Sequence, residues 1–252
     1  MNYLRNLQNL VEERVLPLVA NTPLSWTKSD GTPVSSVDLA VQKELIAIIE
    51  EKYPDHRILY EEGEPKHCFK PSDFTWVIDP IDGTANFLEG KKEYSIAIGL
   101  MKGNEFLESL VIFPAYGESF YAAKGEGVYR NGEIMPVLRP NPEEKEIVFC
   151  SRSYSNAQNR VVGYKPTFYR CATYSVRQVL TGKALAFHAA NTMLYDVGPI
   201  SHIASETGIE CFSGVDQVIS YRADLKRIPI FLAVSPIVSR QLRHLILNES
   251  ES

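Results

Sequence analysis

The sequence lacks the patterns that mark several common classes of protein. Its four cysteines are scattered without a C-x-x-C pair, and its five histidines show no H-E-x-x-H spacing, which argues against zinc hydrolysis. No apolar run approaches the roughly eighteen residues of a membrane span. The opening stretch also carries Glu12 and Glu13 where a secretory signal needs uninterrupted apolar residues. We therefore expect a cytoplasmic protein with reduced thiols and no membrane contact.

An excess of basic charge is also missing. The formal net charge is −5 with both signs interspersed, so no basic face indicates binding to a nucleic acid polymer or an anionic membrane. At 252 residues, of which 44% are hydrophobic, the chain is long enough for one large α/β domain or two small ones that share a core. The composition by itself names no partner.

Helical spacing of apolar residues predicts two amphipathic helices at the start of the chain. The first lies in the opening stretch, and the second covers "SSVDLAVQKELIAIIEEKY", which begins with serine caps. The segment between them, "TPLSWTKSDGTPVSSVD", is rich in Thr, Ser, Pro, Gly and Asp. That composition is typical of a loop, and we interpret the segment as a lid that carries functional residues.

The remaining chain shows two patterns. Short β-branched and aromatic runs, from "RILY" to "ESFYAAKGEGVYRNGEI", predict a largely antiparallel sheet. From Glu146 onward, strands ("EIVFCS", "KALAFHAA", "IPIFLAVS") alternate with helices ("YSVRQVLTG", "VGPISHIASETG" and the chain end). The segment "RPNPEEKE" is the candidate boundary. It divides one compact unit into residues 1–145, with the helices, lid and antiparallel sheet, and residues 146–252, the alternating α/β half.

The stretch "WVIDPIDGTANF" contains the first candidate for chemistry. Asp79 ends an apolar run, Pro80 keeps the chain extended, and Gly83 permits a sharp turn. Asp79 and Asp82 can then converge in a tight loop, where two carboxylates repel each other unless a cation lies between them. Mg²⁺ suits such oxygen-rich clusters, and the carbonyl of Ile81 could add a ligand. The alternative is a turn whose aspartates cap a following helix.

Two further acidic positions favour a metal site over a helix cap. Glu61 and Glu62, in "YEEGE", directly follow the predicted strand "RILY". Asp196 falls between the predicted strand "KALAFHAA" and a helix that we expect to begin near Val197. Each position presents a carboxylate at the end of an element, where functional side chains are often held.

Together these motifs resemble the inositol monophosphatase family of metal-dependent phosphatases, which includes bisphosphate nucleotidases and some fructose-bisphosphatases. "WVIDPIDGTANF" matches the family's first motif, an apolar run with Trp, then D-P-x-D-G-T and a nearby Phe. "TKSDGTPVSSVD" is similar to its lid loop, "ILYEEGE" to its upstream glutamate segment, and "YDVGPISHIASETG" to its second motif. The resemblance covers nearly the whole chain. It implies an α/β fold of the α+β type, a layered α-β-α-β-α sandwich, and a homodimer.

The resemblance also implies roles for particular residues. The metal ligands would be four carboxylates and one carbonyl, from Glu61, Asp79, Asp82, Asp196 and Ile81. They would hold two or three Mg²⁺ ions, which turn a bound water into hydroxide near neutral pH and stabilise the leaving alkoxide. Thr84, paired with Asp38 of the lid segment, would help Glu61 polarise the attacking water. The backbone amides of Gly83 and Thr84, at an expected helix start, would hold a phosphate oxygen.

The second motif departs from the family pattern. Tyr195 precedes Asp196 where the family usually has Trp, and Val-Gly-Pro follows where small residues such as Ala-Ala-Gly are usual. Counted back from Asp196 without gaps, the family's Gly-Ser/Thr-Ala run falls on residues 170–172, and the acid that contacts inositol hydroxyls falls on Ala189. Arg170 offers instead a guanidinium suited to a second phosphate or a carboxylate, or to a structural ion pair.

Two more basic residues are candidates for phosphate contacts. "CSRSYS", residues 150–155, resembles the Ser-Arg-Ser segment of bisphosphate nucleotidases, which makes Arg152 one of them, although the Ala-Asn-Phe after Thr84 is that of inositol phosphatases. Lys28 in the lid is the other, with a solvent-exposed role as its alternative.

The sequence therefore predicts an Mg²⁺-dependent phosphomonoesterase that hydrolyses a small phosphorylated metabolite with a metal-activated water. The alternative within the same chemistry is a 3'(2'),5'-bisphosphate nucleotidase. The alternative from another class is a non-catalytic protein that binds a phosphate ligand.

Overall fold

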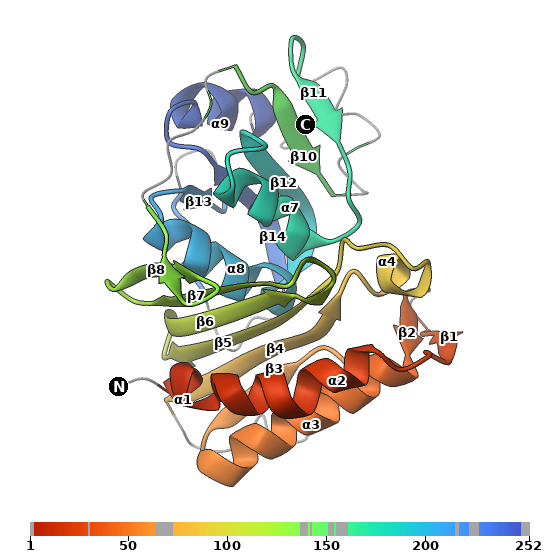
Figure 1. The fold of residues 1–252 in the computed structure, drawn as a ribbon. Coiled ribbons are helices and arrows are strands. Elements are labelled where there is room, and N and C mark those ends of the chain that lie inside the picture. The colour runs from red at the N-terminus through yellow and green to blue at the C-terminus, as the bar shows by residue number, and fades with distance from the viewer. Residues whose placement is uncertain are drawn as a thin grey trace.

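The computed structural model describes residues 3–29, 31–63, 73–136, 141, 143–150, 154, 161–214, 217–221 and 227–247. Within these residues, helices and two sheets form layers in the order helix, sheet, helix, sheet, helix (Figure 1). This arrangement confirms the layered α-β-α-β-α sandwich expected from the sequence. No helix of the described residues is long and apolar enough to cross a membrane.

The first helical layer comes from the amphipathic start of the chain. It consists of α1 (Tyr3–Leu10), a π-helical turn (Val11–Val15), α2 (Leu16–Val19) and α3 (Ser36–Lys52). The side chain of Ser35 caps α3 by accepting hydrogen bonds from the amides of Val37 and Asp38. The apolar faces of these helices pack on one face of the first sheet and form a shared core with it.

The first sheet has seven strands in sequence order, and only its β3–β4 pair is parallel, which confirms the largely antiparallel prediction. Its strands are β3 (Arg57–Tyr60), β4 (Phe74–Asp82), β5 (Ser95–Lys102), β6 (Glu105–Phe113), β7 (Glu118–Ala123), β8 (Gly127–Arg130) and β9 (Glu133–Ile134). The short helix α4 (Thr84–Leu88) follows β4, and a 3-10 turn (Pro114–Tyr116) joins β6 to β7.

The second half supplies the middle helices and the second sheet. Helices α7 (Ala172–Leu180) and α8 (Leu194–Glu206) lie between the two sheets, in one core with residues of both. The second sheet has the order β11-β10-β12-β14-β13, and α9 (Ser239–Leu247) packs on its outer face. Its strands are β10 (Glu146–Phe149), β11 (Lys165–Thr167), β12 (Ala186–Met193), β13 (Glu210–Phe212) and β14 (Arg227–Val234). The division of the chain at residues 145 and 146 stays a prediction.

The structure corrects the sequence-based prediction in three places. Strand β12 extends to Met193 and α8 begins at Leu194, so Asp196 lies inside the first helical turn rather than before a helix that starts near Val197. The lid contains a short hairpin of β1 (Ser25–Thr27) and β2 (Pro33–Ser35). The short strands β11 and β13 were not predicted, because three-residue strands show no periodicity of their own. Among the described residues no cysteine is in a disulfide, and Cys68 lies outside them.

Close packing of α8 on the first sheet depends on two glycines that face the ring of Phe106. A Cβ atom on Gly198 of α8 would lie 2.7 Å from Cζ of Phe106, and one on Gly99 of β5 would lie 2.5 Å from Cε1 of the same ring. We predict that Gly198→Ala lowers the free energy of unfolding by about 1–3 kcal/mol, because overpacking forces this ring or the helix to move. Urea denaturation measures the effect. The loss should shrink in a Phe106→Leu background, and an equal loss in both backgrounds would contradict this cause.

Candidate active site

Strand β4 carries both aspartates of the first motif into one pocket. Side chains three positions apart on a regular strand point to opposite faces, because the strand period is two. Here the pairing of β4 with β5 shifts register between Asp79 and Asp82, as in a β-bulge, so that both carboxylates line the same pocket. Gly83 then turns the chain into α4 with φ of +88°, where a Cβ would lie 2.8 Å from the carbonyl oxygen of Glu93. The tight turn expected from the sequence is therefore present.

Two other elements bring carboxylates to the same pocket. Glu61 follows β3, whose Tyr60 is paired with Ile78 in parallel register, so Glu61 lies beside Asp79 of β4. Asp196 comes from the first turn of α8. With Ile81, Gly83 and Thr84, these side chains line a pocket of about 180 Å³. All the positions predicted as metal ligands thus lie around one small cavity.

The carboxylates in this pocket repel one another. Asp79 is 1% exposed, and its buried Oδ1 has no hydrogen-bond partner among the described residues. Burial, and then the nearby carboxylates of Glu61, Asp82 and Asp196, raise the pKa of Asp79 well above its ordinary value. Burial also raises the pKa of Glu61 to about 8, with Lys28 opposing the rise, and that of Asp196 to about 7. Such a cluster can ionise fully only with additional positive charge.

The pocket fits a hard divalent cation by the chemistry of its donors. Oxygen ligands are what Mg²⁺ prefers, and the unpartnered Oδ1 of Asp79 is a buried acceptor of that kind. Among the described residues, no three carboxylate, imidazole or thiol groups already converge closely enough to enclose one ion. The carboxylates line the cavity wall from several sides instead, an arrangement suited to more than one ion that also binds water or substrate.

Asp82 is held by the beginning of α7. Its Oδ2 accepts hydrogen bonds from the amide of Thr173 at 2.6 Å, from the hydroxyl of Thr173 at 2.5 Å and from the thiol of Cys171 at 3.2 Å. Its Oδ1 accepts one, from the amide of Ala172 at 3.2 Å. Asp82 therefore joins β4 to α7, and Oδ1 retains capacity for another ligand. Sequence reasoning missed Thr173, because no local pattern links it to a residue 91 positions away.

Thr84 and Asp38 are paired as the sequence predicted. The hydroxyl of Thr84 lies 2.8 Å from Oδ1 of Asp38 and 3.0 Å from the carbonyl oxygen of Ile81. The other oxygen of Asp38 accepts hydrogen bonds from the amide and hydroxyl of Ser35, within the cap of α3. Asp38 is fully buried. The carboxylate thus orients the Thr84 hydroxyl at the pocket wall.

Lys28 reaches the carboxylates from the lid. Its Nζ lies 3.2 Å from Oε1 of Glu61 and 2.9 Å from Oε1 of Glu62. Burial lowers its pKa, but the two glutamates outweigh this effect and raise the pKa of Lys28 to about 12. The backbone of Glu62 is fixed by the side-chain amide of Gln42, at 2.6 and 2.9 Å. Lys28 therefore contacts Glu61 at the pocket, and its contact with a phosphate stays a prediction.

The arginine candidates have different outcomes. Arg170 lines the pocket wall, and its guanidinium pairs with Glu89 at 2.6 Å, so the ion pair foreseen as its alternative role is present. Arg152 lies outside the described residues.

Thr192 is a further residue that sequence reasoning missed. Its hydroxyl donates to Oδ2 of Asp196 at 2.9 Å, as does the amide of Met193 at 2.8 Å. These bonds orient Asp196 at the start of α8.

Comparison with known proteins agrees with the fold and the motifs. Residues 5–218 match the inositol monophosphatase family, and the chain belongs to this family of phosphatases. An inositol-1-monophosphatase of Bacillus subtilis is 31% identical over 136 residues, which are 54% of this chain and 51% of the relative. The match thus spans about half the length of that curated relative.

Solved structures extend the similarity of fold over nearly the whole chain. A Thermotoga maritima IMPase superposes with a TM-score of 0.81 at 22% identity, over 96% of both chains. An IMPase/NADP phosphatase complexed with Mg²⁺ and phosphate superposes with a TM-score of 0.79 at 19% identity, over 96% of this chain and 91% of the other. At these identities the superpositions establish the shared fold alone.

Proposed function

We propose that this protein is an Mg²⁺-dependent phosphomonoesterase that hydrolyses a small phosphate monoester with a water activated at the metal site. The observation that carries the proposal is the buried Asp79, whose unpartnered oxygen lies among three other carboxylates in one pocket. A charge cluster of this kind destabilises the fold unless it serves to bind cations. A relative of the same fold was solved with Mg²⁺ and phosphate, which supports this choice of ligand.

The proposal assigns the metal ions to the carboxylates and carbonyl predicted from the sequence, which are Glu61, Asp79, Asp82, Asp196 and Ile81. Two or three Mg²⁺ bound there would supply an activated water and neutralise charge on the phosphate. The chain's own contribution is position: Thr173 and its neighbours hold Asp82, and Thr192 holds Asp196. The amides of Gly83 and Thr84 are proposed as donors to a phosphate oxygen.

Proton movement is assigned to the hydroxyl of Thr84. Because this hydroxyl donates to Asp38, its oxygen can take a proton from the attacking water while its own proton passes to the carboxylate of Asp38, with Glu61 as the other acceptor across the pocket. General-base assistance of this kind contributes about 10²–10⁴-fold to a rate.

We predict that Thr84→Val lowers kcat at least about 100-fold while Thr84→Ser stays within about tenfold of the wild type. Valine keeps the shape of threonine and removes the hydroxyl, whereas serine keeps it. Phosphate release at saturating Mg²⁺ measures both variants. Thermal unfolding measures any loss of stability in the valine variant, in which Asp38 no longer accepts a hydrogen bond from residue 84. Equal activity of the valine and wild-type proteins would remove Thr84 from the mechanism.

The test of the whole proposal is phosphate release with and without Mg²⁺. The panel contains inositol phosphates, 3'-phosphoadenosine 5'-phosphate, fructose 1,6-bisphosphate, sugar monophosphates and an aryl phosphate. Metal-dependent release from any member supports the proposal. Release from none by the folded protein, together with binding of phosphate ligands, would favour the non-catalytic alternative.

The bisphosphate nucleotidase remains the second candidate because Arg170 lines the pocket wall. A second phosphate could replace Glu89 as the partner of its guanidinium, which is partly exposed. Preference for 3'-phosphoadenosine 5'-phosphate within the panel would favour this candidate. The homodimer and the cytoplasmic location stay predictions, and light scattering tests the first.

A further inference from the structure

A second, larger pocket opens beside the carboxylates. It has a volume of about 440 Å³ and shares part of its wall with the smaller cavity, including Asp82, Arg170 and Asp196. Volumes of roughly 300–1,000 Å³ are typical of pockets that hold small molecules. Since the phosphate is proposed to lie at the carboxylates, the alcohol part of the ester would extend into this larger pocket.

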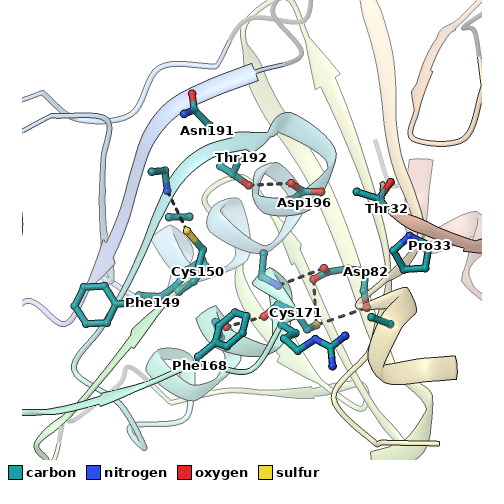
Figure 2. A pocket seen from close by; sticks show the side chains of 17 residues that line it. Thr32, Pro33, Asp82, Phe149, Cys150, Phe168, Cys171, Asn191, Thr192 and Asp196 are labelled. Carbon is teal, nitrogen blue, oxygen red and sulfur yellow. Dashed lines mark hydrogen bonds between the residues drawn. The ribbon is translucent and has the colours of Figure 1, made fainter. Parts of the chain in front are cut away.

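The walls of the larger pocket are mainly hydrocarbon. Strand β12, the start of α7 and the segment before it supply rings and methyl groups, from Phe168, Phe187, Ala172 and Ala189. Figure 2 shows Phe149, Cys150 and Phe168 on one side of the pocket and Asp82 and Asp196 on the other. Phe187 is 1% exposed, so its ring is fixed by the core around it.

Several polar groups of this wall are already used by the protein itself. The hydroxyl of Thr192 donates to Asp196 at 2.9 Å, and that of Ser175 donates to the carbonyl of Cys171 at 2.6 Å. The guanidinium of Arg170 pairs with Glu89. Of the polar side chains left in the described wall, Asn191 and the partly exposed Arg170 offer a polyhydroxylated ring fewer partners than it has hydroxyls. Each hydroxyl buried without a partner costs about tenfold in affinity.

We propose that the alcohol part of the substrate is a largely apolar, ring-sized group rather than a polyol. This inference rests on the proposed phosphomonoesterase function, since it places the phosphate at the carboxylates. Apolar groups enter such a pocket favourably because they bury surface against Phe168 and the alanines without leaving polar atoms unpaired.

The test compares cyclohexyl phosphate with inositol 1-phosphate, which have the same six-membered carbon ring without and with hydroxyls. We expect kcat/KM with Mg²⁺ to be at least about tenfold higher for cyclohexyl phosphate. The intrinsic chemistry works against this result, because the hydroxyl-rich alcohol is the better leaving group. Equal or faster hydrolysis of inositol 1-phosphate would overturn the inference and leave the phosphomonoesterase function standing.

A matched pair of variants at Ala189 tests the wall itself. This buried residue lines the pocket on the same face of β12 as Phe187, and valine and aspartate are similar in size. Ala189→Asp should lower the preference for cyclohexyl phosphate at least about fivefold, because it adds acceptors for hydroxyls, whereas Ala189→Val should keep the preference. A preference that changes equally in both variants would contradict an apolar recognition surface.

If neither ester releases phosphate, the proposed function fails and binding decides the inference. Competition measurements with Ca²⁺ in place of Mg²⁺ then give the affinity of both esters without turnover. Tighter binding of cyclohexyl phosphate would still support an apolar pocket, and equal or weaker binding would overturn it.

Discussion

Asp79→Asn is expected to lower Mg²⁺-dependent phosphate release by about 10³-fold or more and to raise the melting temperature of the metal-free protein at pH 8. The activity falls because a metal ligand contributes several kcal/mol of charge stabilisation, and 1.36 kcal/mol is tenfold in rate. The stability rises because the buried carboxylate, 1% exposed, is surrounded by three others that it repels. An amide of the same shape removes this repulsion and can donate to its neighbours.

The neighbouring variant Asp82→Asn is the matched control. It should lose activity to a similar degree but lower the melting temperature, by about 4–8 °C, because an amide nitrogen cannot accept the bonds that the start of α7 donates. Whichever carboxylate oxygen the nitrogen replaces, the backbone amide of Thr173 or that of Ala172 loses its acceptor. Thermal unfolding and phosphate release, measured on both variants without and with Mg²⁺, test the pair. Retention of a tenth of the activity by Asp79→Asn would contradict its role, and stability changes of equal sign would contradict the stated difference.

The stabilisation by Mg²⁺ should grow with pH. The pKa of Glu61 is raised to about 8 and that of Asp196 to about 7, against ordinary values of 4.5 and 3.8. The folded, metal-free protein therefore binds more protons than the unfolded chain between these limits, and its stability falls as the pH rises through this window. Mg²⁺ replaces the protons and removes the penalty. The gain should be small at pH 5.5 and about 5–10 °C in melting temperature at pH 8, for Mg²⁺ at about 100 times its dissociation constant.

The difference between melting curves with and without Mg²⁺ isolates this effect. Burial lowers the pKa of His202 to about 4, which gives a slope of opposite sign at low pH, but this histidine does not line the carboxylate pocket. Its contribution cancels in the difference. Asp196→Asn should reduce the growth of the Mg²⁺ effect with pH. A gain that is independent of pH would show that the carboxylates are already ionised without the metal.

Long periodic segments of the fold were predictable from the sequence. Ser35 caps α3, and Gly182 follows the end of α7, as their local chemistry indicates. The predicted start of α8, near Val197, was about three residues too late. Asp196 is followed by Val-Gly-Pro, which masks a helix start, and the cap is completed by bonds from Met193 and Thr192 that only the folded chain forms.

The sequence by itself determined the family, the motif residues and the turn at Gly83, because turn chemistry and strand ends are local properties of a few adjacent residues. The tertiary structure alone decided how Asp82 is held, where Lys28 lies and how apolar the larger pocket is. Lys28 contacts Glu61, which is 33 positions away in the sequence, and Thr173 donates to Asp82, which is 91 positions away. Such pairs are selected by the packing of whole layers. The β4 bulge and the glycines that let α8 approach the first sheet bring the carboxylates to one point, and no local pattern specifies that distance.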